Sequence, residues 1–328
     1  MPLRLEEFQQ PVITGYVQNV PPARDYLLAS VMPKENSFDI NFAYNVVNGQ
    51  YAKAASITGW NASAPLRDVK DFERAFGQVA KVQHGFRLDE TQLIQYNRPR
   101  VPAEADAVVN TVYVSTDELS QGVDDIEEYM RAQAIYTGQL KYDDEENDIH
   151  INVDFGIPVE NKLDATTAWS GPDAKPLTDL QAAVKQYQKK NQRRKPIMMH
   201  MTSATEANLL NSEQIRTQVY GTGNGQRLMT TADIQNAFSA LGLPPYQIND
   251  DVIVIGDEEV QLLADNKVVL IGADLGKTII GPTVENNYAP GKFAIPTVKT
   301  NPPEQSVYVG EAVFPALQRP QSIVIVSV

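Results

Sequence analysis

The feature that most constrains the fold is a narrow apolar stripe that continues through a long segment. Between Pro102 and Thr137, apolar residues recur at spacings of three, four and seven: Val108, Val112, Leu119, Val123, Ile126, Met130 and Ala134. This spacing places them on one face of an α-helix. Pro102 suits its first turn and Gly138 the position after its last. At 1.5 Å per residue such a helix is about 50 Å long, which is typical of a strut lying across a sheet.

Two features of this segment bear on its continuity and its surroundings. Gly122 and the β-branched residues of 108–114 lower the helix propensity, so a break in the helix remains open. Four acidic residues fall outside the apolar stripe: Asp124, Asp125, Glu127 and Glu128. We expect them to face solvent and to favour solubility, not acid–base catalysis.

The first 40 residues are interrupted by prolines at positions 2, 11, 21, 22 and 33. Because proline fixes φ and lacks an N–H donor, we expect an extended arm with at most one short helix, near 23–30. An arm of this kind cannot bury itself and needs another surface to lie against.

Alternating apolar residues predict a strand over 38–46, and 51–57 is a candidate second strand. Asn48-Gly49 is a strong signal for a type I′ turn, because both residues tolerate positive φ. The hairpin tip could instead lie further out, near 59–65, and the local sequence does not decide between the two positions.

Beyond the long helix, alternation over 139–142 and 149–155 predicts a hairpin whose acidic turn is 143–148. From residue 175 the pattern is that of a compact α/β region. Helices are expected to be capped by Thr178, by a capping box that starts with Ser203, and by Thr231. Short strands are predicted over 197–201, 252–255, 260–263 and 268–271. A strand is also predicted over 307–309, and the apolar end, 322–328, must pair inside a sheet with a partner distant in sequence.

Composition excludes several classes of protein. The 328 residues suffice for two domains or one large one. The absence of cysteine excludes disulfides, thiolate nucleophiles and cysteine-held metals. With 28 basic and 41 acidic side chains, the net charge of −13 argues against a protein that grips nucleic acid or an anionic membrane. No apolar run approaches the roughly 18 residues of a membrane span, and no secretory signal is expected.

The sequence contains no recognisable catalytic constellation. Its histidines, His84, His150 and His200, lack metal-ligand spacing, and no serine lies in a nucleophile elbow. The glycine-rich segments 221–225 and 272–278 lack the spacing of a phosphate-binding loop. We therefore expect no catalytic residue, cofactor or metal ion, and no enzymatic activity.

Two features could mediate contacts. The basic run over 189–195 is either a solvated helix end or a contact to acidic groups of a neighbouring chain. Trp60 and Trp169 lie in predicted loops, where each could anchor in a partner's pocket or fold back on its own domain.

Five segments and their order point to a known family. They are 46–49 (VVNG), 132–142 (AQAIYTGQLKY), 151–156 (INVDFG) followed by Trp169-Ser170, 263–270 (LADNKVVL) and 322–328 (SIVIVSV). Together they resemble the major capsid proteins of tailed bacteriophages, in particular the lambda-type protein E family, which has the Hong Kong 97-type shell fold. The resemblance extends from about residue 35 to the end of the chain.

The resemblance implies an α+β fold with four parts. These are an N-terminal arm (1–44), an extended hairpin loop (45–82), a peripheral domain (83–158 with 306–328) and an axial domain (159–305). The peripheral domain would contain the spine helix, about 103–137, the hairpin 139–156 and the C-terminal strands.

By the same resemblance, the protein would self-assemble from hexamers and pentamers into the icosahedral head that encloses packaged double-stranded DNA. The implied partners are a separate scaffolding protein and a portal protein, and a decoration protein is an open option. Assembly would take place in the host cytoplasm, without a membrane, and the protein would end in the virion.

Eight residues are the expected contacts between subunits: Tyr51, Lys53, Trp60, Arg67, Lys70, Arg74, Arg193 and Arg194. Lys53, Lys70 and Lys81 lie where some relatives form a lysine–asparagine cross-link, but no partner asparagine is marked and we do not expect one. Two alternatives remain at this point. They are an encapsulin-like shell around enzyme cargo and a soluble α/β enzyme that uses 221–225.

Overall fold

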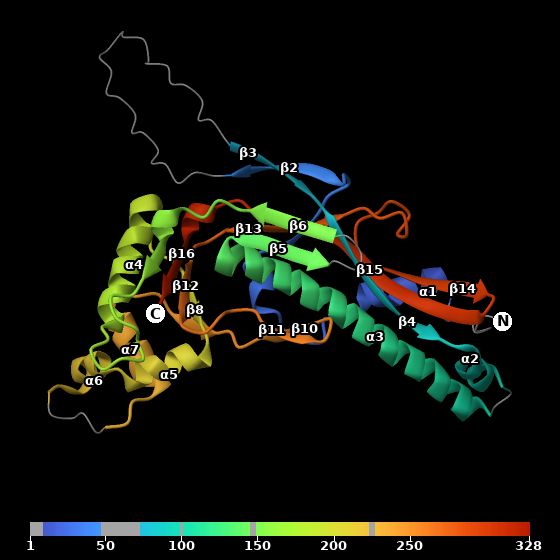
Figure 1. The fold of residues 1–328 in the computed structure, drawn as a ribbon, viewed down its shortest axis with the longest axis horizontal. Helices are drawn as coiled ribbons and strands as arrows, with labels where there is room; N and C mark the ends of the chain where they lie inside the picture. Colours follow the sequence, from blue (N-terminus) through green and yellow to red (C-terminus); the bar gives the residue numbers. More distant parts are fainter. Residues whose placement is uncertain (1–8, 47–72, 99–100, 145–148, 223–226) are drawn as a thin grey trace, which may run out of the picture. The chain divides into compact units, whose positions relative to one another are not determined.

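The computed structural model describes residues 9–46, 73–98, 101–144, 149–222 and 227–328, which form a mixed fold of helices and sheets (Figure 1). The chain divides into two compact units, each assembled from segments that are distant in sequence. The first unit combines Met1–Ala43, Phe76–Arg131 and Lys277–Ala316, and the second combines Tyr44–Ala75, Ala132–Gly276 and Leu317–Val328.

The first unit is organised around a five-stranded sheet. Its strands β1 (Lys34–Asn36), β13 (Gly276–Gly281), β15 (Pro303–Leu317) and β14 (Phe293–Thr300) lie in this order, and β4 (Ala80–Leu88) also pairs with β15. The long strand β15 pairs antiparallel with β14 along 303–310 and with β4 along 305–313. The strand predicted at 307–309 is therefore confirmed.

The long helix is confirmed and is not broken at Gly122. α3 (Pro102–Ala132) continues into one π-helical turn, Gln133–Thr137, and the chain leaves it at Gly138 with φ of 77°. Stripe residues Val112, Leu119 and Val123 lie in a buried cluster of this unit. Gly122 lies directly against the imidazole of His84, so the close approach of the two segments leaves no room for a side chain.

The expectation that the first 40 residues are irregular is wrong for 10–19. This segment forms helix α1 (Gln10–Asn19), because Pro11 lies in the first turn, where its missing N–H costs no hydrogen bond. Ile13 and Val17 are buried, and the Thr14 hydroxyl donates to the carbonyl of Ala294 at 2.9 Å. The helix expected near 23–30 is a single 3-10 turn, Leu27–Ala29. A short helix that had no counterpart in the sequence pattern, α2 (Glu90–Asn97), follows β4.

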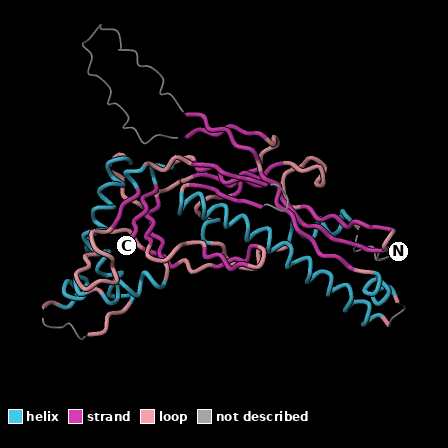
Figure 2. The backbone as a smooth tube through the Cα atoms, viewed as in Figure 1, coloured by secondary structure: helices cyan, strands magenta, loops and turns pink. Residues whose placement is uncertain are grey.

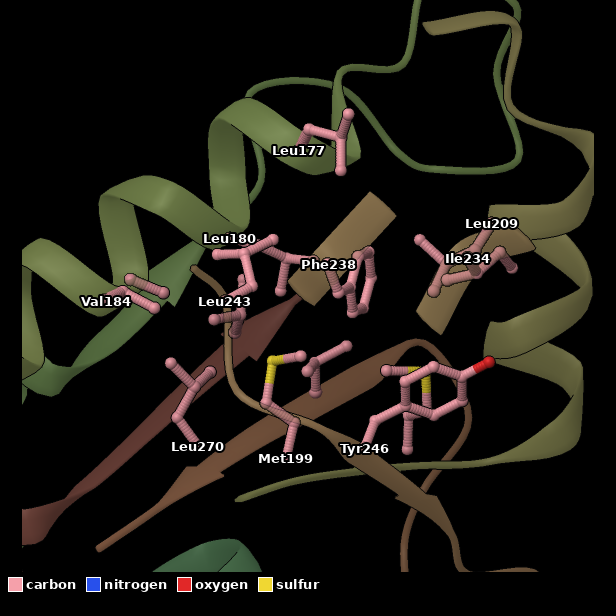
Figure 3. Packing of buried hydrophobic residues seen from close by; sticks show 14 of the residues in the cluster. Leu177, Leu180, Val184, Met199, Leu209, Ile234, Phe238, Leu243, Tyr246 and Leu270 are labelled. Carbon is pink, nitrogen blue, oxygen red and sulfur yellow. The ribbon is translucent and has the colours of Figure 1, made fainter. Parts of the chain in front are cut away.

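The second unit is an α/β layer. Its sheet has the order β7 (Lys162–Asp164), β16 (Ile323–Ser327), β12 (Lys267–Ile271), β8 (Met198–Met201) and β9 (Tyr246–Ile248). Its helices are α4 (Pro176–Lys190), α5 (Ser203–Asn211), α6 (Glu213–Tyr220) and α7 (Thr231–Leu241). Leu180 of α4, Phe238 of α7 and Leu270 of β12 belong to one core cluster (Figure 3).

Three helices of this unit have capping residues one to three positions before the predicted ones. α4 begins at Pro176 and not after Thr178. The capping residue of α5 is Thr202, whose side chain accepts from the Thr205 amide, and that of α7 is Thr230. In α5 and α7 the hydroxyl that is correctly placed for the third amide belongs to the residue before the predicted cap.

The C-terminal strand is confirmed, but it lies in a different sheet from the one expected. β16 pairs antiparallel with β12 and parallel with β7. The sequence interpretation grouped 306–328 with the spine helix, whereas Leu317–Val328 belongs to the second unit. Residues Ile323–Val326 are buried, and both edges of their strand are paired within the second sheet.

Three two-stranded sheets also lie among the described residues, and Figure 2 shows their strands in magenta. β5 (Gln139–Asp144) pairs with β6 (Ile149–Asp154), which confirms the predicted second hairpin. β10 (Val252–Ile255) pairs with β11 (Glu258–Gln261). β2 (Asn41–Val46) pairs with β3 (Glu73–Gln78). No helix within the described ranges is long and apolar enough to cross a bilayer.

Candidate assembly surfaces

Three of the four acidic residues in 124–128 are buried, so the expectation that this group faces solvent is wrong for Asp124, Glu127 and Glu128. Glu127 and Glu128 are 1% and 0% exposed, and Asp124 is 6% exposed. Arg131, one turn further along, lies 2.8 Å from the Glu127 carboxylate and 3.0 Å from that of Glu128. Lys292 lies 2.7 Å from Asp124. Cations from this helix and from distant segments therefore balance the charge that burial would otherwise make unfavourable.

The segment before β1 is attached to these carboxylates. Arg24 and the Tyr26 hydroxyl both contact Asp125, at 2.7 and 2.8 Å. The amide of Leu28 donates to Glu128 at 2.6 Å. The far side of α3 is thus covered by the N-terminal segment of the same unit, which explains why these polar residues are not in water.

Two carboxyl groups in this cluster share one proton. Burial raises the pKa of Glu311 well above its usual value, and its hydrogen bond to Glu127 raises it further. Burial would also raise the pKa of Glu127, but the hydrogen bond from Glu311 and the charges of Lys34 and Arg131 outweigh it and lower that pKa to about 2. Glu311 is therefore the protonated partner and donates to the Glu127 carboxylate. Lys34 lies 2.9 Å from Glu127 and 3.3 Å from Glu311.

The base of the predicted extended loop presents apolar side chains at the surface. Phe38 and Ile40, which precede β2, are 78% and 51% exposed. Phe42 is anchored inward, with its ring edge-on to that of Phe314 at a centroid distance of 5.5 Å. A cavity of about 510 Å³ opens beside Phe42 and Gly77. The pair β2–β3 is therefore fixed at its base while apolar surface remains free beside it.

Three of the eight predicted contact residues are described. Arg74 is exposed on β3, and Arg193 and Arg194 are exposed in the turn that follows α4. The other five lie outside the described residues, as does the Asn48-Gly49 turn: Tyr51, Lys53, Trp60, Arg67 and Lys70.

Lys81, the third lysine considered for a cross-link, is in an ion pair with Glu285 of its own chain.

Trp169 folds back on its own unit. It is 2% exposed, and its indole N–H donates to the Asp179 carboxylate at 3.0 Å. Of the two roles considered for this residue, the structure selects the internal one.

The histidines make structural contacts. Burial lowers the pKa of His200 to about 4. Its Nδ1 lies 2.8 Å from the Tyr136 hydroxyl, which in turn accepts from Asn249 at 2.8 Å. His84 Nε2 lies 2.6 Å from the carbonyl of Leu119. His150 lies exposed, 3.0 Å from Asp143. Among the described residues, no group of histidine and acidic side chains could hold a metal ion.

The glycine-rich segment 272–278 differs from a nucleotide site. Thr278 lies within β13, where its hydroxyl accepts from Arg131 and donates to the carbonyl of Met32, both at 2.8 Å. The other glycine-rich segment, 221–225, follows the end of α6, and its residues 223–225 lie outside the described ranges.

Comparisons with known proteins agree with this architecture. The family model for phage major capsid protein E matches residues 9–328. No match is found among curated proteins. A phage-related protein from Bordetella bronchiseptica RB50 is 12% identical, with a TM-score of 0.57 over 97% of this chain and 96% of that one.

Two further solved structures share the fold. A candidate prophage capsid protein from Escherichia coli CFT073 is 14% identical, with a TM-score of 0.57 over 78% of this chain and 79% of that one. The capsid of the native GTA particle is 13% identical, with a TM-score of 0.50 over 94% of this chain and 93% of that one.

Proposed function

This chain belongs to the phage major capsid protein E family, and we propose how such a subunit builds its shell. It is a shell-forming capsid protein with the Hong Kong 97-type fold. In our proposal, copies associate through hexamers and pentamers into the icosahedral head of a tailed phage, which then encloses double-stranded DNA. The net charge of −13 suits a container that lies beside DNA without gripping it.

The parts of the chain take the following roles in this proposal. The unit that contains α3 is the peripheral domain, and the α/β unit is the axial domain. The β2–β3 pair carries the extended loop, through which one subunit contacts the next. This assignment is supported by the exposed Phe38 and Ile40, because apolar side chains at a surface gain most when a neighbour covers them.

The partners follow from the same reasoning. They are those expected of a subunit of this family. We therefore propose a separate scaffolding protein, a portal protein at one vertex, and a decoration protein as an optional addition. Assembly takes place in the host cytoplasm, and the finished protein is part of the virion.

The observation that carries the proposal is the family match over almost the whole chain. It favours a phage head over a cargo compartment and over a soluble enzyme built on 221–225. The direct test is negative-stain microscopy and sedimentation of the protein produced together with the products of its neighbouring reading frames. Closed shells support the proposal, and a monomer that persists beside its scaffold contradicts it.

The role of the loop base is tested by replacing Phe38 and Ile40 with serine. Because both side chains are largely exposed, the free energy of unfolding of the free subunit should stay within about 0.5 kcal/mol of the wild-type value. Shell yield should fall strongly. Val159→Ser is the matched control, since this residue is 81% exposed in the other unit. Normal shells from the Phe38 and Ile40 variant would contradict this role, as would normal shells from a chain that lacks 59–72.

A further inference from the structure

The hairpin β10–β11 presents an apolar and acidic surface that its own unit does not cover. Val252 and Val254 are 42% and 64% exposed, whereas Ile253 between them is 2% exposed. Val254 lies opposite Glu259 in the strand pairing. One face of the hairpin therefore packs inward, and the other shows two valines to solvent.

Acidic side chains surround these valines. The segment 250–259 reads DDVIVIGDEE and contains five carboxylates and no basic residue. Asp257, Glu258 and Glu259 are exposed. None of these three is in an ion pair with any described residue of the chain.

The same unit carries a surface with the opposite charge. The segment 189–195 reads KKNQRRK and contains five basic residues and no acidic one. It follows the end of α4, where Gln192 and Arg193 have φ of 55° and 63° and turn the chain sharply. Arg193, Arg194 and Lys195 are exposed, and Lys195 donates to the carbonyl of Gly242 at 3.0 Å.

An apolar groove lies directly beside this basic segment. Its volume is about 520 Å³, and Lys195 lines it together with Phe238, Leu243, Pro245 and Tyr246. The groove is thus apolar in its interior and basic along one side. The β10–β11 hairpin is apolar at its centre and acidic around it, so the two surfaces are complementary in both respects.

The two surfaces lie apart within one chain. In Figure 1, strands β8 and β12 lie between α4 and the β10–β11 hairpin of this unit. A contact between complementary surfaces on different sides of a subunit is heterologous, and its repetition closes a ring when the rotation allows it.

We propose that the β10–β11 hairpin of one copy docks into the groove beside 189–195 of the next copy. The valines enter the groove, while Glu258 and Glu259 face Arg193 and Arg194. The inference rests on the proposed shell assembly and names the surfaces that hold the α/β units together in a ring. It also assigns the basic run to an intermolecular contact instead of a solvated helix end.

Cysteine pairing tests the contact without depending on shell formation, because the chain has no cysteine of its own. Val254→Cys and Ser239→Cys, combined in one chain, place a thiol on the hairpin and another at the groove. Under oxidation or a short bis-maleimide linker, a head-to-tail contact yields a ladder of dimers, trimers and larger chains on a denaturing gel. Each single variant carries only one thiol per chain, so its cross-linked products can be no larger than dimers. The matched control combines Val254→Cys with Asp173→Cys.

The outcomes separate this inference from the proposed function. A ladder with shells supports both, and a ladder without shells supports the contact and overturns the icosahedral proposal. Shells without a ladder overturn the contact and leave the capsid function intact. If neither forms beside the scaffold, both are wrong.

Charge reversal provides a second, independent measurement. Reversing Arg193 and Arg194 to glutamate, or Glu258 and Glu259 to lysine, should weaken the association of subunits by about 100-fold, because like charges then face each other. Combining both reversals in one chain should restore most of the affinity. Reversing Glu160 and Asp173 to lysine is the matched control and should have no effect. Equal affinity in the wild type, the two separate reversals and their combination would overturn the inference.

Discussion

Replacing Arg131 with methionine tests whether the buried acidic cluster of α3 depends on its own cation. The guanidinium lies 2.8 Å from Glu127, 3.0 Å from Glu128 and 2.8 Å from Thr278, and its side chain is 2% exposed. Removing one partner of a buried ion pair usually costs about 3–5 kcal/mol, because the other charge stays buried. Since Lys34 remains 2.9 Å from Glu127, we expect the lower end, about 3 kcal/mol.

The measurement is urea unfolding of the unassembled subunit, together with hydrogen exchange at the Leu28 amide, which donates to Glu128. Arg194→Met is the matched control and should change the free energy of unfolding by less than about 0.5 kcal/mol, because that guanidinium is exposed. Adding Glu128→Gln to Arg131→Met should recover part of the loss, since it removes the uncompensated charge. A loss below about 1 kcal/mol for Arg131→Met would refute the reasoning and show that these carboxylates do not need this cation.

Three further substitutions have defined outcomes in unfolding experiments. Gly122→Ala should destabilise the subunit by about 1–3 kcal/mol, although alanine favours helices, because the new methyl group collides with His84. Unchanged stability would contradict the packing seen there. Trp169→Phe should cost about 1–2 kcal/mol, because it leaves the Asp179 carboxylate without its indole donor. Glu311→Gln should remove a pH dependence. The raised pKa of Glu311 means that the folded state keeps a proton that the unfolded state releases above about pH 4.5, so wild-type stability falls as the pH rises through this range. An equal slope in both proteins would refute the shared proton.

Local patterns predicted the elements whose stability is local. The long helix, the hairpin β5–β6 and most strands of the α/β unit follow from periodicity and turn residues, and they lie where expected. The cap positions of α5 and α7 shifted by one residue, because neighbouring hydroxyls such as Thr202 and Ser203 are equally suitable in sequence and only the backbone selects between them.

The burial of the α3 carboxylates could not be predicted, because their partners are distant. Arg24 and Lys34 lie about a hundred residues before them, and Lys292 and Glu311 follow more than 160 residues later. Only the spacing of Glu127 and Glu128 to Arg131 is visible locally, and such pairs are common on exposed helices. Charge patterns thus predict a polar face but not what covers it.

The helix α1 was missed for a different reason. Pro11 was interpreted as a helix breaker, whereas in the first turn it favours the helix. Its apolar residues, Ile13 and Val17, are too few to indicate a helix without the sheet that they cover. For the C-terminal strand, sequence predicted burial correctly but could not select between two sheets that both accept an apolar strand.

The distribution of cations ties these observations to assembly. In an acidic chain every basic side chain has acidic groups available, and the first unit uses several of its own to neutralise α3: Arg24, Lys34, Arg131 and Lys292. The run 189–195 is different, because Arg193 and Arg194 are exposed and in no ion pair with a described residue. Five like charges in seven residues repel one another, and this cost persists until an anionic surface approaches. The hairpin β10–β11 carries three carboxylates in the same condition, Asp257, Glu258 and Glu259. A monomer therefore leaves both charges uncompensated, and a ring of identical copies relieves both at once.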